Sequence, residues 1–250
     1  MHYYRSILET AGHTPLVRLK KIEERFYLPF SLYGKVERTN PSGSIKDRAA
    51  ISMIRDGKKK GLIKDKTLII EPTSGNMGIS LAMISAYFGL PCHIYMPESA
   101  SKERVALISA YGAKVILTPA SEGMEGAVKR AEEERKAVKD SFCPSQFDNP
   151  ANPAGHFMTA NEILEDLDGN VSCVVAGIGT GGTITGIAKL YKELGRTTSI
   201  VGVEPASSPL LTKDEVGPHK IEGLGPNFKP SILASSLLHA VIDVSDEDAF

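Results

Sequence analysis

Short apolar runs that alternate with helical segments along the whole chain constrain the fold more than any other feature. Residues 67–70 form a continuous apolar run, the pattern of a strand that is buried on both faces, and residues 171–176 are predicted to form a second buried strand. Each run is followed by a glycine-rich turn and a helical segment, over residues 75–88 and 182–194. Such alternation is typical of parallel sheets with helices on both faces. The sequence therefore predicts an α/β fold, and its two glycine clusters suggest two sheets that face each other across a cleft.

Charge and cysteine content narrow the class of protein. The formal net charge of −1 gives no electrostatic reason to expect nucleic acid or an anionic membrane as a partner. No apolar run reaches the roughly 18 residues of a membrane-spanning helix, and the N-terminus lacks the apolar region of a signal peptide. The 3 cysteines and 6 histidines show no metal-ligand spacing. Cys92 and Cys173 fall in apolar runs, which favours core packing. We therefore predict a cytoplasmic protein without a metal site.

Residues 40–48, Asn-Pro-Ser-Gly-Ser-Ile-Lys-Asp-Arg, contain the first candidate for catalysis. Asn-Pro and Ser-Gly are turn dipeptides, and the residues after them continue as a helix for which Ser44 is the candidate N-cap. Lys46 should therefore lie in the first turn of a helix, where the partial positive charge disfavours a cation. Partial burial would lower its pKa further, and Schiff-base chemistry requires a neutral amine. The alternative is an ordinary surface lysine, because the chain has 29 Lys and Arg residues.

Two loops have the composition of anion-binding sites. Residues 71–78, Glu-Pro-Thr-Ser-Gly-Asn-Met-Gly, follow a predicted strand and can offer N–H groups, hydroxyls and a helix dipole to an anion. Residues 177–183, Gly-Ile-Gly-Thr-Gly-Gly-Thr, are richer in glycine than a turn needs and can surround a phosphate. They match neither the dinucleotide-binding register nor the ATP-binding loop. For both loops the alternative is a plain strand-to-helix turn.

These three segments together are the parts that a pyridoxal 5′-phosphate enzyme needs. The lysine can bond to the cofactor, residues 177–183 can hold its phosphate, and an asparagine amide can contact its ring oxygen. Residues 71–78 can hold the carboxylate of an amino acid.

The chain also resembles the cysteine synthase / cystathionine β-synthase family of fold type II pyridoxal phosphate enzymes. The resemblance covers residues 7–250, and the motifs that carry it are residues 12–17, 40–48, 71–78, 145–150, 177–183 and 221–225. It implies a fold like the tryptophan synthase β subunit, with two open, twisted, mostly parallel sheets and the cofactor in the cleft between them. It also implies a smaller, mobile domain over residues 38–150 and a larger domain made of residues 1–37 plus 151–250.

The resemblance gives each candidate residue a role. Lys46 resembles the Schiff-base lysine that also removes the Cα proton of the substrate. The cofactor-binding residues implied in this way are Lys46, Asn76, Gly179, Thr180, Gly181, Gly182 and Thr183. The implied substrate-binding residues are Thr73, Ser74, Gly75, Met77, Gln146, Gly223 and Gly225.

The activity implied by the resemblance is β-replacement that makes L-cysteine from O-acetyl-L-serine and sulfide, in a homodimer. Three related activities stay open: cystathionine formation from serine and homocysteine, sulfhydrylation of O-phosphoserine, and cysteine desulfhydration. A truncated, non-catalytic homologue that binds an amino acid or a partner is the alternative from another class.

The chain departs from the family pattern at four places. Met77 replaces the usual threonine, His13 replaces the usual asparagine, and Pro226-Asn227 follows Gly225 where relatives often have a small residue. Residues 156–163 are one residue shorter than usual. Family members also continue past the Ser-Asp-Glu-x-Ala-Phe stretch, so we expect the larger domain to lack its usual C-terminal segment. The first four departures concern substrate identity more than cofactor binding.

Overall fold

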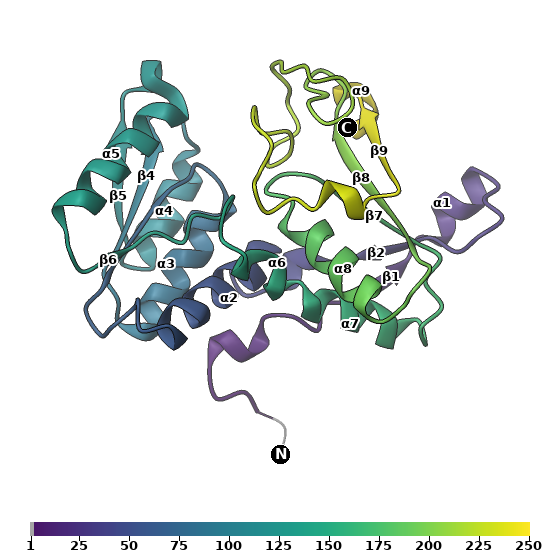
Figure 1. Ribbon diagram of the computed structural model, residues 1–250, viewed down its shortest axis with the longest axis horizontal. Coiled ribbons are helices and arrows are strands. Elements are labelled where there is room, and N and C mark those ends of the chain that lie inside the picture. Colours follow the sequence, from purple (N-terminus) through teal and green to yellow (C-terminus); the bar gives the residue numbers. More distant parts are fainter. Residues whose placement is uncertain (1–2) are drawn as a thin grey trace.

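Three sheets carry the strands of the computed structural model, which describes residues 3–250. The four-stranded sheet has the order β5-β4-β3-β6 and the three-stranded sheet has the order β7-β8-β9. All pairings in these two sheets are parallel, whereas β1 and β2 form an antiparallel pair. The two parallel sheets lie in separate halves of the molecule (Figure 1), which confirms the predicted α/β fold with mostly parallel sheets.

The strands are β1 (Leu16–Arg18), β2 (Tyr33–Lys35), β3 (Leu68–Pro72), β4 (Cys92–Pro97), β5 (Lys114–Thr118), β6 (Ser141–Phe142), β7 (Cys173–Gly177), β8 (Ser199–Pro205) and β9 (Ala240–Val244). The α-helices are α1 (Lys20–Arg25), α2 (Lys46–Lys59), α3 (Asn76–Phe88), α4 (Lys102–Ala110), α5 (Gly123–Ala137), α6 (Ala151–Gly155), α7 (Phe157–Asp166), α8 (Gly182–Glu193) and α9 (Asp246–Ala249). The short 3₁₀ helices are η1 (Ile7–Thr10), η2 (Glu37–Thr39), η3 (Ala120–Glu122) and η4 (Ser235–Leu237).

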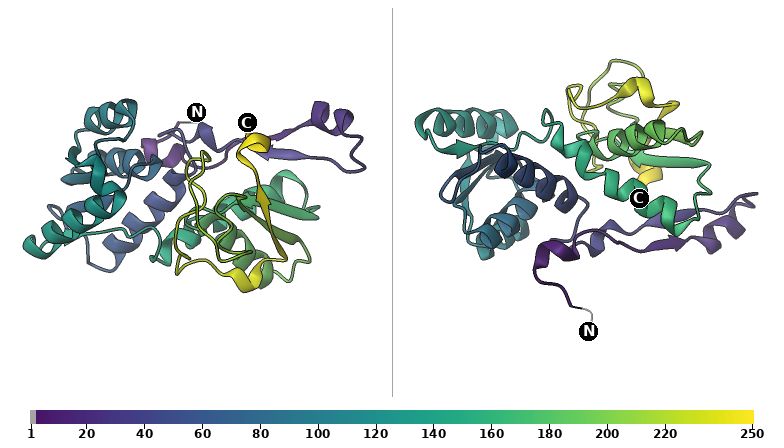
Figure 2. Two further views of the ribbon diagram at one scale, coloured as in Figure 1. Left: turned by 90° about the horizontal axis from the view of Figure 1, so that it is seen from above. Right: turned by 60° about the horizontal axis from the view of Figure 1, so that its bottom comes forward.

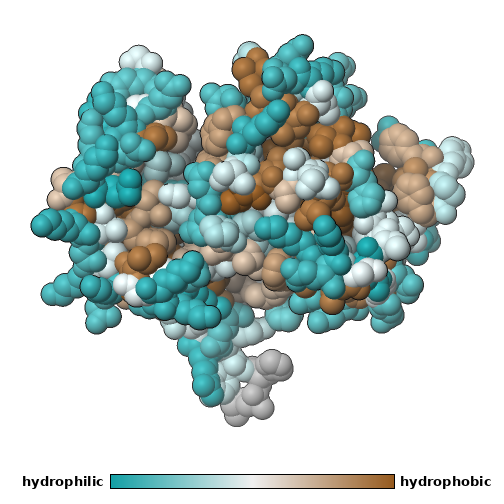
Figure 3. Space-filling model, viewed as in Figure 1, coloured by the Kyte–Doolittle hydropathy of each residue, from teal (hydrophilic) through white to brown (hydrophobic). Residues whose placement is uncertain are grey.

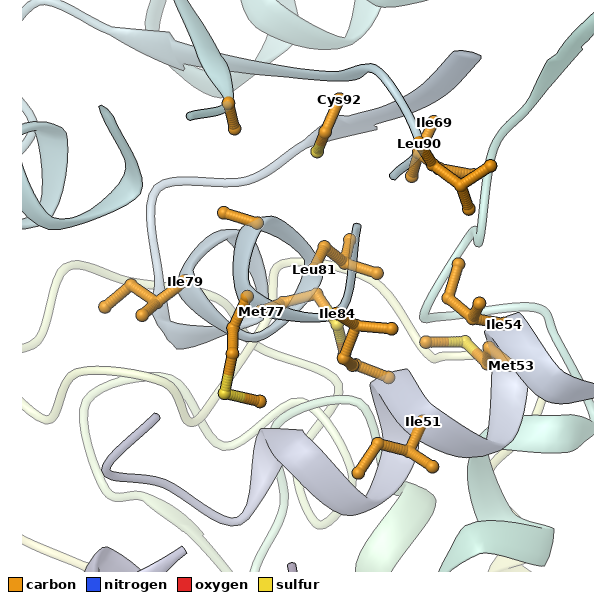
Figure 4. Packing of buried hydrophobic residues seen from close by; sticks show 14 of the residues in the cluster. Ile51, Met53, Ile54, Ile69, Met77, Ile79, Leu81, Ile84, Leu90 and Cys92 are labelled. Atoms are coloured by element: carbon orange, nitrogen blue, oxygen red, sulfur yellow. The ribbon is translucent and has the colours of Figure 1, made fainter. Parts of the chain in front are cut away.

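The four-stranded sheet is covered on both faces, as the continuous apolar run at residues 67–70 predicts. Ile69 packs with α2, α3 and α4 in the largest hydrophobic cluster, and Figure 4 shows it beside Leu90, which follows α3. Leu68 and Ile70 point to the opposite face, where they pack with Ala127 and Ala131 of α5. Because side chains alternate along a strand, this division gives β3 a buried residue at every position from 68 to 71.

The three-stranded sheet differs from the prediction on one face. Val174 and Ala176 of β7 pack in the cluster formed with α7 and α8, but Val175 is 59% exposed and Cys173 is exposed as well. The prediction that residues 171–176 form a buried strand is therefore wrong for one face of the sheet, and so is core packing of Cys173. The physical reason is that α7 and α8 cover only one side of the sheet. Figure 3 shows extensive apolar surface over this half of the molecule.

The β1–β2 hairpin projects from the rest of the fold, with α1 at its tip (Figures 1 and 2). Glu23 of α1 holds the hairpin together, because its carboxylate accepts hydrogen bonds from Arg18 and from the Leu32 N–H. Four aromatic side chains of the hairpin remain exposed: Phe26, Tyr27, Phe30 and Tyr33.

Two helix predictions need correction, and one domain prediction remains open. The helix expected over residues 152–167 is divided at His156 into α6 and α7, and the helix expected from Ser44 begins at Lys46. The division of the chain into domains 38–150 and 1–37 plus 151–250 stays a prediction. Within residues 3–250, no helix has the length and apolar character needed to cross a membrane.

Candidate active site

Lys46 is the first residue of α2, directly after the turn of residues 40–45. The Gly43 N–H donates to the Asn40 carbonyl at 2.8 Å and closes this turn. Ile45, not Ser44, occupies the N-cap position, and the Ser44 hydroxyl instead accepts a hydrogen bond from the Lys46 N–H at 3.3 Å. The prediction that Lys46 lies in the first turn of a helix is therefore confirmed, although the cap is a different residue.

The Lys46 amine is half-buried and has no counter-ion. Burial lowers its pKa below the ordinary value of 10.5. Its Nζ forms no ion pair or hydrogen bond with any other residue between 3 and 250. Most buried lysines are paired with an acid, so an unpaired one at the start of a helix has the properties of a nucleophile or a general base.

The next residue, Asp47, fixes the turn that precedes Lys46. Its buried carboxylate accepts hydrogen bonds from the Ser42 N–H, at 2.7 Å, and from the Ser42 hydroxyl. The same hydroxyl lies 3.0 Å from the Ser80 hydroxyl in α3. Asp47 therefore joins the turn to α3 and limits the positions that the Lys46 backbone can adopt.

Arg48 holds α2 to the rest of the fold through a buried ion-pair network. Its guanidinium contacts Glu37 at 2.7 Å and Glu162 of α7 at 2.7 Å. Glu162 also accepts hydrogen bonds from the His13 N–H at 2.8 Å and pairs with Lys35 at 2.9 Å. Burial opposes ionisation of Glu162, but the hydrogen bonds from Arg48 and Lys35 outweigh it and lower the pKa to about 2. His13, where the family usually has asparagine, thus contributes through its backbone.

The loop after β3 joins the strand to α3, and one of its hydroxyls is bonded within the loop. Thr73 is buried, and its hydroxyl accepts a hydrogen bond from the Gly75 N–H at 3.3 Å. Asn76 is the first residue of α3 and is exposed, and Ser74 is half-buried. Arg104 of α4 donates to the Ser74 carbonyl at 3.3 Å and also pairs with Glu222. Arg104 therefore connects this loop to the segment that contains Gly223 and Gly225.

Met77 differs from its predicted place. Its side chain is only 1% exposed and belongs to the largest hydrophobic cluster, where Figure 4 shows it on the side of α3 that faces α2. A side chain in this position fills the core and does not face a ligand. The Met77 side chain therefore does not take the predicted substrate contact, and only its backbone is left for that role. Compared with the family's usual threonine, methionine lacks a hydroxyl and adds volume to the core.

Gln146 is held against the end of β3 by Glu71. The Glu71 carboxylate accepts hydrogen bonds from the Ser145 N–H at 3.0 Å and the Gln146 N–H at 3.4 Å. Both Glu71 and Gln146 are buried. Burial raises the pKa of Glu71 to about 7, against the opposing effect of these two backbone donors.

Residues 179–183 form a narrow cradle at the N-terminus of α8. The Gly182 N–H donates to the Thr180 hydroxyl at 3.2 Å, and Gly181 is the N-cap of the helix. A Cβ atom on Gly179 would collide with the Gly223 carbonyl, and one on Gly182 would collide with the Asn152 amide. Glycine is thus required at both positions by close approach. The cradle also brings residue 223 next to residue 179, as both site predictions together require.

Two buried polar residues were missed by the sequence analysis. His156 lies 3.3 Å from the Thr183 hydroxyl and 3.3 Å from the Thr159 hydroxyl. Burial, and then the charges of Lys46 and Arg48, lower its pKa to about 3, so it is neutral. Asn152 donates to the Gln146 carbonyl and to Thr180. The only local signal for Asn152 was the repeated Asn-Pro pair at residues 149–150 and 152–153.

Comparisons with known proteins agree with this arrangement. The family model described as "Pyridoxal-phosphate dependent enzyme" matches residues 7–250. The chain is 48% identical to cysteine synthase B of Campylobacter jejuni over 250 residues, which are 100% of this chain and 82% of the relative.

Solved structures give the same result. The crystal structure of cysteine synthase from Entamoeba histolytica is similar with a TM-score of 0.96 and 40% identity, over 99% of this chain and 74% of that one. A hydrogen sulfide-producing enzyme from Fusobacterium nucleatum is similar with a TM-score of 0.92 and 43% identity, over 99% of this chain and 83% of that one.

Proposed function

Because the chain belongs to the family of pyridoxal-phosphate-dependent enzymes, we propose that it makes L-cysteine by β-replacement, from O-acetyl-L-serine and sulfide. The observation that carries the proposal is Lys46, a half-buried amine with a lowered pKa and no acidic partner among residues 3–250. The names of similar proteins support the choice of substrates.

The residues present fit pyridoxal phosphate. The cradle of residues 179–183 lies at the N-terminus of α8 and carries two threonine hydroxyls, which are the kinds of group that phosphate sites use. Neutral His156 beside Thr183 adds a hydrogen-bonding partner without a competing charge. When bound, the cofactor supplies a ring that takes up the electron pair left at Cα after deprotonation. We propose that Lys46 bonds to it and that Asn76 contacts its ring oxygen.

The remaining site residues bind and orient the amino acid. We propose that Thr73, Ser74 and Gly75, the backbone of Met77, and Gln146 hold the substrate carboxylate. Lys46 Nζ accepts the Cα proton, for which its lowered pKa makes it a suitable base. Gly223 and Gly225 line the mouth of the cleft. The contacts of Glu71 with residues 145 and 146 keep Gln146 buried and reduce the access of water.

Cysteine desulfhydration is the second candidate, because a solved relative is a hydrogen sulfide-producing enzyme. The same residues serve both reactions, which differ in whether sulfide is consumed or released. The other two alternatives should be assayed together with these reactions. They use serine with homocysteine, or O-phosphoserine with sulfide.

The first test is the visible absorbance of the purified chain after incubation with pyridoxal phosphate and removal of the excess. We expect a yellow protein whose absorbance band shifts when O-acetyl-L-serine is added and returns when sulfide follows, with L-cysteine as product. A band that shifts only with cysteine, with release of sulfide, would replace the proposal by desulfhydration. A protein that remains colourless would contradict both.

We also propose that the chain is a cytoplasmic homodimer that uses small substrates and binds neither nucleic acid nor membranes. The projecting hairpin supports dimerisation, because a two-stranded sheet is marginally stable alone and this one exposes 92% of Tyr27 and 59% of Phe30.

Replacing Tyr27 and Phe30 by serine together should convert the dimer to a monomer, because the change removes most of the apolar surface at the hairpin tip. Size-exclusion chromatography with light scattering measures the mass. Tyr87→Ser is the matched control, because Tyr87 is 49% exposed in α3, away from the hairpin. A wild-type chain that is monomeric at micromolar concentration, or a double variant that remains dimeric, would contradict the proposal.

A further inference from the structure

A single buried amide lies between two of the proposed binding segments. Asn152, in α6, is 1% exposed, and its Nδ2 donates to the Gln146 carbonyl at 2.7 Å and to the Thr180 hydroxyl at 3.2 Å. Gln146 belongs to the proposed carboxylate site and Thr180 to the phosphate cradle. Both protons of the amide are therefore used to join the two segments.

The connection extends further on each side. The Gln146 N–H donates to Glu71 at the end of β3, and the Thr180 hydroxyl accepts from the Gly182 N–H at the start of α8. All four polar side chains, those of Glu71, Gln146, Asn152 and Thr180, are less than 7% exposed. A buried hydrogen-bond chain has few alternative partners, so a displacement at one member is transmitted to the next.

The oxygen atom of the Asn152 amide also lies beside the cradle. Asn152 Oδ1 is buried without a hydrogen-bond partner among residues 3–250, and it lies against Gly182 in the cradle. A buried polar atom without a partner is costly and calls for an explanation. The cost is tolerated here because any other orientation of the amide would give up the bonds to Gln146 and Thr180.

We propose that Asn152 is a positioning residue that couples the carboxylate site at Gln146 to the phosphate cradle at Thr180. It contacts the reacting atoms of neither ligand, but it fixes the distance between the two places where they bind. The inference rests on the proposed function, and it adds that a change in the cradle alters the affinity for the amino acid.

The test measures KM for O-acetyl-L-serine, kcat, and the dissociation constant of pyridoxal phosphate. Asn152→Ala should raise KM roughly tenfold or more, because the hydrogen bond that fixes Gln146 and the one that joins it to Thr180 are both lost. kcat should change less than KM, since Lys46 is unaffected. Thr180→Val is the milder variant: it removes one hydroxyl of the cradle and should raise KM for the amino acid by roughly three- to tenfold.

A double-mutant cycle separates coupling from general damage. If Asn152 transmits the effect, Thr180→Val adds little to KM in the Asn152→Ala background. Asn149→Ala is the matched control. Asn149 is an amide of the same segment whose bonds, to the Pro144 carbonyl and from the Ala151 N–H, reach neither Gln146 nor the cradle.

Each outcome decides a different point. Additive effects in the cycle, or an Asn149 variant with the same rise in KM, would show loss of loop order and overturn the inference while the proposed function stands. A Thr180→Val variant that weakens only cofactor binding would likewise overturn the inference while the proposed function stands. A wild-type chain that neither binds the cofactor nor responds to O-acetyl-L-serine would overturn the proposed function and the inference together.

Discussion

Lys46→Ala is expected to lower the rate of cysteine formation by about 10³-fold or more, because we propose that the residue supplies both the covalent attachment and the general base. Loss of a positioned base alone costs about 10²- to 10⁴-fold. The variant should retain part of its affinity for pyridoxal phosphate, since the phosphate cradle lies on another helix. Steady-state rates and equilibrium dialysis measure the two effects separately.

The control for this variant is Lys60→Ala, at the other end of α2. Lys60 is exposed and paired with Asp56 at 2.6 Å, so its loss should leave turnover unchanged. Mass spectrometry after borohydride reduction should find the cofactor attached to the peptide that contains Lys46. Turnover that survives in Lys46→Ala, or attachment at another lysine, would show that the assignment is wrong.

Glu162→Ala should lower the free energy of unfolding by about 3–5 kcal/mol, the range found when one partner of a buried ion pair is removed. The Glu162 side chain is 4% exposed, and its loss leaves Arg48 and Lys35 without their shared acceptor. Urea unfolding measures the change. Glu165→Ala, an exposed acid on the same helix, should change the value by about 0.5 kcal/mol or less. Equal effects of the two variants would contradict a stabilising network.

The same carboxylate predicts how stability responds to acid. The pKa of Glu162 is lowered from 4.5 to about 2 in the folded chain, so the folded state binds fewer protons than the unfolded state between these values. Its contribution is therefore complete above pH 4.5 and is lost as the pH falls toward 2. Glu162→Gln should remove this part of the acid dependence, which unfolding curves at pH 6 and pH 3 can measure.

Local sequence patterns predicted the features that depend on neighbours along the chain. The alternation of strands and helices, the two-faced burial of β3 and the place of Lys46 all follow from periodicity and turn residues. The 177–183 segment was recognisable as a cradle from its glycines. Packing between distant segments was not predictable in this way: whether β7 is covered on both faces depends on which helices lie above it.

The site residues Asn152 and His156 were missed because their contacts also join segments that are distant in the sequence. Nothing near Asn152 or His156 in the sequence indicates that their partners are 28 and 27 residues away, at Thr180 and Thr183. Met77 was predicted to bind substrate because of its place in the family's substrate loop, whereas the rotation of α3 directs that side chain into the core.

The network around Arg48 also has a consequence for the order in which the protein matures during synthesis. Its members are separated by as many as 149 positions, between His13 and Glu162, and the pair of Arg48 and Glu162 spans 114. A nascent chain that has not yet emerged beyond residue 162 has no acceptor for either Arg48 or Lys35 from α7. The ion pair between α2 and α7 therefore forms late, after the strands of the four-stranded sheet have left the ribosome. The Lys46 side chain gains its final environment only after residue 162 has emerged, so chains arrested before that point cannot carry the complete proposed site.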